Sequence, residues 1–205
     1  MMPYQEVRTA TYQKEKMGNY HCGDHYFFAE KDQGFICAIA DGLGSGEIAG
    51  ESSQAVIDVI KNNLYLSDNA LVTKCVQELA GKRGAVIGIL RLDFVNEKYT
   101  YSSIGNISLV ITMNQKQRKR TIPRPGFLGN YERQLKVVEG DLEKNMGFIM
   151  FSDGVSDEEL SQLCLFNENV DEIIKAFSHM SNEGREDDTT LIAMRYMREQ
   201  LGTDT

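Results

Sequence analysis

The chain has 205 residues, of which 41% are hydrophobic and 25% charged, and its formal net charge is −8. This length suits one domain with a full hydrophobic core, and we expect a single domain over residues 1–205. The negative charge argues against nucleic acid and anionic membranes as partners.

Two absences in the sequence bear on location. No apolar run approaches the roughly 18 residues needed to span a bilayer, and the first 16 residues lack the apolar segment of a secretory signal. The cysteines form no C-x-x-C pair, which predicts reduced thiols; they are Cys22, Cys37, Cys75 and Cys164. We therefore expect a cytoplasmic protein and, with no heptad pattern, a monomer.

The first half of the chain changes from a strand pattern to a helix pattern. Residues 34–40 form an apolar run typical of a buried strand. Apolar residues at helical spacing then predict two helices, beginning near Glu47 and Asp68. We expect Ser67 or Asp68 to cap the second helix and Gly81 to end it. The inner face of the first helix is expected to hold Ile48, Val56, Ile57, Ile60 and Leu64.

Strand patterns dominate the second half. Residues 84–95, 98–105 and 107–113 are joined by turns too short for parallel crossovers, so we expect antiparallel neighbours. Further strands are expected at 134–140, 147–152 and 189–196, and one helix at about 170–180. These elements predict an α+β fold with an antiparallel two-sheet core flanked by helices.

One basic cluster, "KQRKR" at Lys116–Arg120, follows Asn114-Gln115 between two strand patterns. It is typical of an exposed hairpin end or strand. We interpret it first as a solvated turn, and the alternative is a docking patch for an acidic protein partner.

Four segments place an aspartate at the end of a predicted strand. Asp41 and Asp153 each follow an apolar strand and precede a glycine, and Asp24 begins a strand-like run. Asp187 and Asp188 come directly before the last predicted strand. A single Asp-Gly pair usually marks a turn. Because strand ends cluster in a sheet protein, however, these carboxylates would repel one another unless cations balance them.

Oxygen ligands of this kind suit Mg²⁺ or Mn²⁺. Gly42 lets the backbone approach a cation closely and offer its carbonyl as a ligand. His21 and His25 flank Asp24, but their segment has a turn and strand pattern, so a histidine metal site is not favoured. Residues 44–49 match the loose dinucleotide fingerprint G-x-G-x-x-A, which belongs to parallel βαβ units and is also not favoured here.

Six motifs resemble, in order, those of metal-dependent serine/threonine phosphatases of the type 2C class. The resemblance extends over nearly the whole chain and is strongest to the short bacterial branch that includes SpoIIE. The motifs are "CGD" (22–24), "ADGLGSG" (40–46), "KRGA" (82–85), "SIGN" (103–106), "FSDG" (151–154) and "EDDTT" (186–190). The resemblance implies an αββα four-layer sandwich, two antiparallel sheets flanked by helices, with two divalent cations, Mn²⁺ or Mg²⁺.

The resemblance also implies roles for individual residues. Asp41 would bridge both cations, with the Gly42 carbonyl on one of them, while Asp153 and Asp187 would hold the other. Asp24 would complete the centre, directly or through water. The supporting positions implied are Asp188, where many relatives have asparagine, together with Gly105 and Asn106.

The chain departs from the family pattern at two positions. Gly23 stands where many members carry glutamate, and Asn19 stands where larger relatives carry an arginine that grips the phosphate. The phosphate would then be bound through metal ions and water, or Arg83 or another cationic group would replace the missing arginine. The chain also lacks room for the flap of larger members, which leaves an open cleft suited to a folded protein substrate.

The resemblance implies hydrolysis of phosphoserine or phosphothreonine on a protein, without a covalent intermediate. The most similar branch members act on stressosome scaffold proteins and damp the general stress response through its sigma factor. Two alternatives remain at this point: a phosphatase for an anti-sigma-factor antagonist, and a metal-free pseudophosphatase that serves as a binding module.

Overall fold

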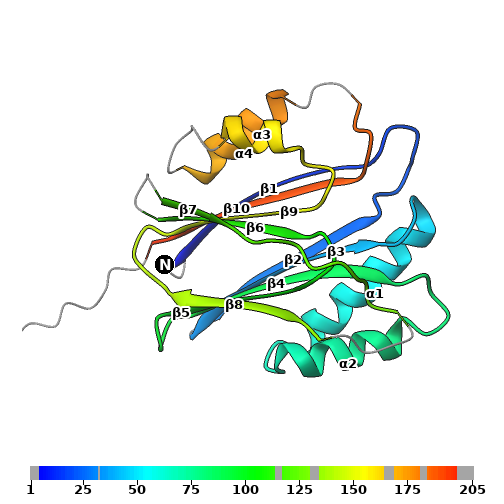
Figure 1. Cartoon of the computed structure of the whole chain (residues 1–205), viewed down its shortest axis with the longest axis horizontal. Coiled ribbons are helices and arrows are strands. Elements are labelled where there is room, and N and C mark those ends of the chain that lie inside the picture. Colours follow the sequence, from blue (N-terminus) through cyan, green and yellow to red (C-terminus); the bar gives the residue numbers. More distant parts are fainter. Residues whose placement is uncertain are drawn as a thin grey trace, which may run out of the picture.

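The computed structural model describes residues 5–31, 33–113, 117–129, 134–163, 169–180 and 184–197. Two antiparallel sheets face each other, and a pair of helices covers the outer face of each sheet (Figure 1). The αββα sandwich expected from the motifs is therefore confirmed.

Over the described residues, each sheet has five strands, and these strands pair only in antiparallel fashion. The first sheet has the order β1 (Val7–Lys14), β10 (Thr189–Tyr196), β9 (Gly147–Phe151), β6 (Ser108–Met113) and β7 (Gln117–Arg120). The second has the order β2 (Asp24–Lys31), β3 (Gly34–Gly42), β4 (Ala85–Asp93), β5 (Lys98–Ile104) and β8 (Lys136–Asp141).

The helices cover the outer faces in sequence-local pairs. Helices α1 (Glu47–Asn62) and α2 (Asp68–Glu78) pack on the second sheet, and α3 (Asp157–Leu163) and α4 (Val170–Met180) pack on the first. Ser67 caps α2 by accepting a hydrogen bond from the Ala70 amide, as expected. Within the described residues, no helix is long and apolar enough to cross a membrane.

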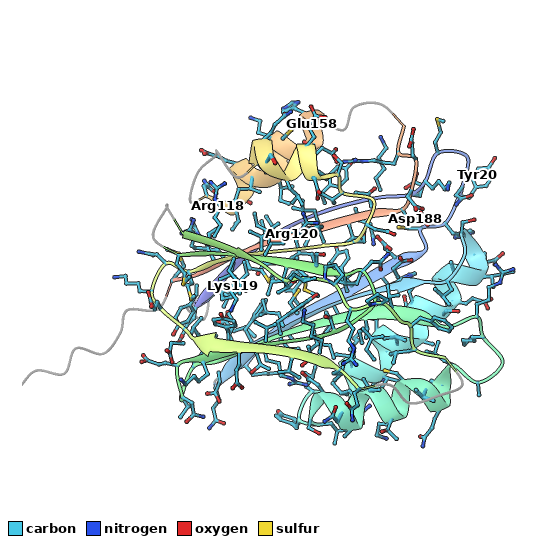
Figure 2. All side chains as sticks on the ribbon, in the orientation of Figure 1. Tyr20, Arg118, Lys119, Arg120, Glu158 and Asp188 are labelled. Carbon is cyan, nitrogen blue, oxygen red and sulfur yellow. The ribbon has the colours of Figure 1, made fainter. Side chains whose placement is uncertain are left out.

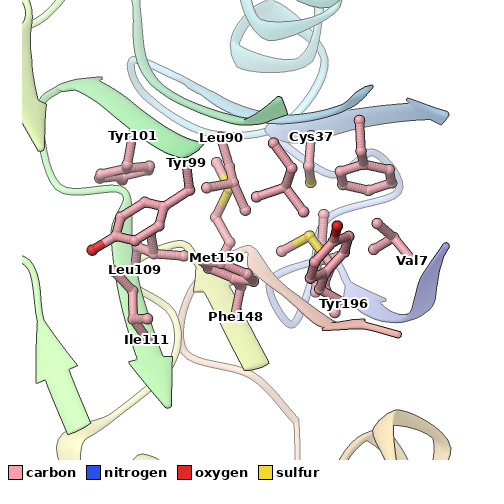
Figure 3. Close-up of a cluster of buried hydrophobic side chains, with 14 of the residues drawn as sticks. Val7, Cys37, Leu90, Tyr99, Tyr101, Leu109, Ile111, Phe148, Met150 and Tyr196 are labelled. Atoms are coloured by element: carbon pink, nitrogen blue, oxygen red, sulfur yellow. The ribbon is translucent and has the colours of Figure 1, made fainter. Parts of the chain in front are cut away.

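Three buried clusters hold the layers together, and the largest lies between the sheets (Figure 3). Strand β3 shows how one strand serves two of these clusters. Its residues Phe35, Cys37 and Ile39 point into the inter-sheet core, whereas Ile36 and Ala38 pack under the helices. Because both faces of β3 are covered, its sequence is a continuous apolar run rather than an alternating one.

One prediction about strand pairing was wrong. Strands β4 and β5 are antiparallel neighbours, but β6 does not pair with β5 and instead lies in the other sheet between β9 and β7. The chain crosses between the sheets at Gly105, which has a φ of +95° and has no room for a side chain against Val86. A short connection therefore joins two sheets here instead of closing a hairpin.

Other differences concern the elements near the surface. Strand β1 and the seven-residue helix α3 were not predicted, so two helices rather than one follow β9. Ile48 was expected on the buried face of α1, but it is 52% exposed. Leu64 lies beyond the end of α1 and is only partly buried.

The basic cluster forms the edge strand β7 over Gln117–Arg120, while Lys116 lies outside the described residues. Arg120 pairs with Asp157 at 2.5 Å and stacks over the Phe151 ring. Cys22, Cys37 and Cys75 are free thiols, whereas Cys164 lies outside the described residues.

Candidate metal centre

The predicted aspartates come together at one end of the sandwich. Asp24 opens β2 and lies directly opposite Asp41 in the register of the β2–β3 pair. Asp153 follows β9, and Asp187 and Asp188 precede β10, the strand that pairs with β9. Both sheets therefore contribute carboxylates to the same end.

Asp24 is the most deeply buried of these groups, with 1% of its surface exposed. Its Oδ2 accepts a hydrogen bond of 2.7 Å from the Ser152 hydroxyl, whereas its buried Oδ1 has no partner among the described residues. Burial raises the pKa of Asp24 to about 7, even though hydrogen bonds from Ser152 and Thr190 oppose the rise.

A polar network behind Asp24 joins the two sheets, and its residues were not among the predicted site residues. The Ser152 hydroxyl, which donates to Asp24, accepts a hydrogen bond of 2.9 Å from the Thr190 amide. The Gln13 side-chain amide donates to the Asp24 carbonyl at 3.0 Å and to the Thr190 hydroxyl at 3.1 Å. These contacts fix the position of Asp24 from β1, β9 and β10. The available signal was the serine before Asp153 in "FSDG".

Asp41 is half-buried and is surrounded by like charge. Desolvation, followed by repulsion from Asp24, Asp153, Asp187 and Asp188, raises the pKa of Asp41 to about 8. All five carboxyl groups are thus close enough to interact. A cluster of this kind carries more negative charge than the surrounding protein balances.

Asp153 and Asp187 stand at the solvent-exposed side of the cluster. Asn106 donates a hydrogen bond of 2.6 Å to Asp153 Oδ2, so this residue does support the cluster. Desolvation and repulsion from Asp187 raise the pKa of Asp153. The Lys16 ammonium lies 3.9 Å from Asp187 Oδ1, a loose ion pair with both groups partly exposed.

Asp188 is buried and accepts a hydrogen bond of 2.9 Å from the Lys16 amide. A Cβ on Gly23 would lie 2.7 Å from its Oδ2, so the glycine makes room for this carboxylate. The departure from the family glutamate at position 23 therefore has a steric reason in this chain. Asp188 holds the loop between β1 and β2 against the segment before β10.

Gly42 is required for packing. A Cβ at this position would lie 1.8 Å from the Ala49 carbonyl oxygen, so a side chain here would displace α1. The Gly42 amide donates to the Gly23 carbonyl at 3.1 Å, which ties the two strand ends together. Close contact between the Asp41 strand and α1 thus explains this glycine independently of any ligand.

Arg83 is exposed and lies against the loop that follows Asp41. Its Nη1 is 2.6 Å from the position that a Cβ on Gly44 would occupy, and Gly44 has a φ of +109°. The Leu43 amide donates to the Gly84 carbonyl at 3.0 Å, which holds the two loops together. The structure therefore places a cationic side chain beside the loop that follows Asp41.

The donor set fits hard divalent cations. It consists of carboxylate oxygens, one of which, Asp24 Oδ1, is buried with no hydrogen-bond partner in the part of the chain that the structure describes. Within the described part of the chain, no group of three or more His, Cys, Asp or Glu side chains is arranged to hold a metal ion. His25 is bonded through Nδ1 to Ser53 of α1 at 2.8 Å, which leaves the candidate ligands all oxygen.

The sheet topology is incompatible with a dinucleotide-binding role for the loop at residues 44–49. The loop between Gly42 and α1 follows a strand of a wholly antiparallel sheet, whereas the fingerprint needs a parallel βαβ unit.

The antiparallel sandwich with carboxylates at one end defines the class of type 2C-like phosphatases, and comparisons with known proteins agree. Phosphoserine phosphatase RsbX of Bacillus subtilis (strain 168) is 32% identical over 188 residues, which cover 92% of this chain and 94% of the relative. A crystal structure of RsbX in complex with magnesium superposes with a TM-score of 0.86 at 31% identity, covering 94% of this chain and 96% of that one.

A more distant structure shares the fold. The catalytic domain of the serine/threonine phosphatase PstP in complex with two manganese ions has a TM-score of 0.68 at 14% identity, covering 94% of this chain and 99% of that one. The family described as Stage II sporulation protein E (SpoIIE) matches residues 31–197. The chain therefore belongs to the SpoIIE family of metal-dependent, type 2C-like phosphatases.

Proposed function

We propose that the chain hydrolyses phosphoserine or phosphothreonine on a protein, using two divalent cations, Mn²⁺ or Mg²⁺. The observation that carries the proposal is the set of mutually repelling carboxylates at one end of the sandwich. The proposed ligands are Asp24, Asp41, the Gly42 carbonyl, Asp153 and Asp187.

Charge balance supports this assignment. Four ionised aspartates carry −4 and two divalent cations carry +4, so the loaded centre is close to neutral and does not repel a phosphate dianion. When bound, the cations supply Lewis-acid stabilisation of the phosphoryl oxygens and lower the pKa of a water molecule. No cysteine nucleophile is needed for this chemistry.

The chain's own residues have separate tasks in the proposal. Ser152 orients Asp24, Asn106 orients Asp153, and Asp188 fixes the loop before β2 through the Lys16 amide. Arg83 binds a phosphate oxygen, which replaces the arginine that larger relatives carry at the position of Asn19. This role is supported by its place beside Gly44.

The proposed substrate is a phosphorylated stressosome scaffold protein, with residues 1–205 acting as one catalytic domain and as a cytoplasmic monomer. Support comes from the 32% identity with a phosphoserine phosphatase over most of both chains. Hydrolysis of such a phosphoprotein would damp the general stress response. Preference for a phosphorylated anti-sigma-factor antagonist would redirect the same chemistry to another partner.

The test is Mn²⁺-dependent phosphate release from phosphorylated scaffold and antagonist proteins by the wild type and Asp41→Asn. Asp141→Asn is the matched control, because Asp141 is exposed and pairs with Lys98. We expect release only with metal, a loss of at least about 100-fold in Asp41→Asn, and wild-type activity in the control. If the wild type binds no metal and releases no phosphate, a binding module is the better account.

A further inference from the structure

Three exposed apolar side chains lie around the carboxylate end of the sandwich. Tyr20 is 97% exposed, Met17 74% and Ile48 52%. We call Met17, Tyr20 and Ile48 the apolar rim. Tyr20 and Asp188 are found toward the same end of the molecule in Figure 2.

The turn that carries Met17 and Tyr20 is held in place. The Asn19 amide donates to the Lys16 carbonyl at 3.0 Å, and Gly18 adopts a φ of +90° within this turn. The Met17 amide donates to the Arg185 carbonyl at 2.8 Å, close to Asp187 and Asp188 in the chain. The backbone beneath the exposed side chains is therefore anchored to the segment that bears two of the carboxylates.

Ile48 extends the rim onto α1. The Asn19 side chain lies within 4.0 Å of the position of a Cβ on Gly46, so the turn touches the loop that enters this helix. Ile48 is the second residue of α1 and faces solvent, whereas Ala49, Val56 and Ile60 bury the helix in the core. The rim thus extends from the segment before Asp187 to the loop after Asp41.

The fold does not need these side chains in their positions. Tyr20 contributes almost no buried area to the core, and a tyrosine or methionine exposed on a fixed loop is typical of residues that become buried at protein interfaces.

We propose that the apolar rim is the docking surface for the folded phosphoprotein substrate and contacts the surface around its phosphorylated residue. The rim borders the proposed catalytic site. When a phosphorylated residue of a folded protein reaches Asp41, the protein surface around that residue must therefore lie over Met17, Tyr20 and Ile48. This inference rests on the proposed function. It adds a surface by which the enzyme would distinguish a folded phosphoprotein from a small phosphoester.

The test compares Tyr20→Ala with Tyr65→Ala. Tyr65 is the matched control, because it is 92% exposed and lies beyond the C-terminal end of α1, whereas the rim lies at the N-terminal end. Activity is measured with Mn²⁺ on p-nitrophenyl phosphate, on a short phosphoserine peptide copied from the scaffold's phosphorylation site, and on the intact phosphorylated scaffold protein.

For Tyr20→Ala we expect the ratio of kcat/KM on the intact protein to kcat/KM on p-nitrophenyl phosphate to fall about tenfold. Tyr20→Ala/Ile48→Ala should lower this ratio further, and Tyr65→Ala should leave it unchanged. The ratio of peptide to p-nitrophenyl phosphate should stay constant in all variants, because a short peptide does not reach across the rim.

Affinity for the intact phosphoprotein, measured by calorimetry with EDTA present, separates docking from hydrolysis. Weaker binding by Tyr20→Ala than by Tyr65→Ala supports the docking surface, even if the wild type hydrolyses nothing and the proposed function fails. Equal ratios and equal affinities in the two variants would overturn the docking surface while leaving the phosphatase activity standing.

Discussion

The aspartates at the two ends of the sandwich are in different environments. At one end, Asp141 of β8 pairs with Lys98 of β5, and both side chains are largely exposed to water. At the other end, Asp24 is buried, has an oxygen without a partner among the described residues, and is repelled by Asp188 and Asp153. At the first end the aspartate is already paired with a lysine. The second end carries an excess of negative charge that bound cations would balance.

The largest expected effect comes from removing metal. EDTA should abolish phosphate release, and added Mn²⁺ should restore it, because the carboxylate end depends on cations and the Asp141 end does not. Iodoacetamide should have little effect, since Cys37 and Cys75 are buried and burial raises the pKa of the Cys22 thiol to about 12. Activity that resists EDTA but is lost on alkylation would contradict the account.

Ser152→Ala tests whether Asp24 depends on the hydrogen bond from Ser152 to bind metal. The change removes the donor to Asp24 Oδ2 and the acceptor for the Thr190 amide, so we expect metal affinity to fall by about 10- to 100-fold. Titration calorimetry with Mn²⁺ measures this. Ser161→Ala, an exposed serine on α3 that bonds only its own helix, is the control. Identical affinities in both variants would show that Ser152 does not position Asp24.

Arg83→Ala should have a smaller effect, because Arg83 is exposed and is not one of the proposed metal ligands. If Arg83 binds a phosphate oxygen, its loss should raise KM for p-nitrophenyl phosphate about tenfold with little change in kcat. Arg83→Lys should recover part of this loss, and Lys82→Ala on the same loop should not change KM. An unchanged KM in Arg83→Ala would leave phosphate binding to cations and water alone.

The smallest effect concerns the stability of the metal-free protein. Burial and repulsion raise the pKa of Asp24 to about 7 and of Asp41 to about 8, so protonation of these carboxyls favours the folded state. Their contribution is complete below the ordinary aspartate pKa of 3.8 and is lost as the pH rises through about 7 and 8.

The melting temperature in EDTA should therefore fall between pH 5 and pH 8.5 by roughly a few degrees. Asp41→Asn should flatten this dependence, whereas Asp141→Asn should retain it. Saturating Mn²⁺ should raise the melting temperature most at the upper end of the range. A metal-free protein with the same melting temperature at both pH values would show that the cluster is not strained by charge.

Much of the fold could be predicted because its periodic patterns are strong. The apolar run of β3 and the tight turn before it place Asp24 opposite Asp41, which is why strand-end carboxylates were expected to meet. The crossing at Gly105 could not be predicted, because a short connection between strands does not reveal whether it closes a hairpin or changes sheets. Strand β1 was missed because its residues alternate only weakly in burial.

The acidic residues of the site could be predicted from the sequence, but the hydrogen bonds that hold them in position could not. Acidic residues beside strand ends are visible in the sequence, whereas the hydrogen bonds of Ser152 and Gln13 link segments far apart in the chain. For Ile48 the prediction itself was wrong, because its helical spacing indicated a buried position. The first turn of α1 packs on the sheet through Ala49 and Gly50, whereas Ile48 lies on the solvent side of the same turn.

The most direct test of the central claim is a crystal structure of the protein grown with Mn²⁺, with anomalous diffraction used to locate the metal. The account predicts two manganese peaks at the end of the sandwich that carries Asp24, Asp41, Asp153 and Asp187, and none beside Asp141. Crystals that contain Mn²⁺ but show no peak among these carboxylates would contradict the two-metal centre.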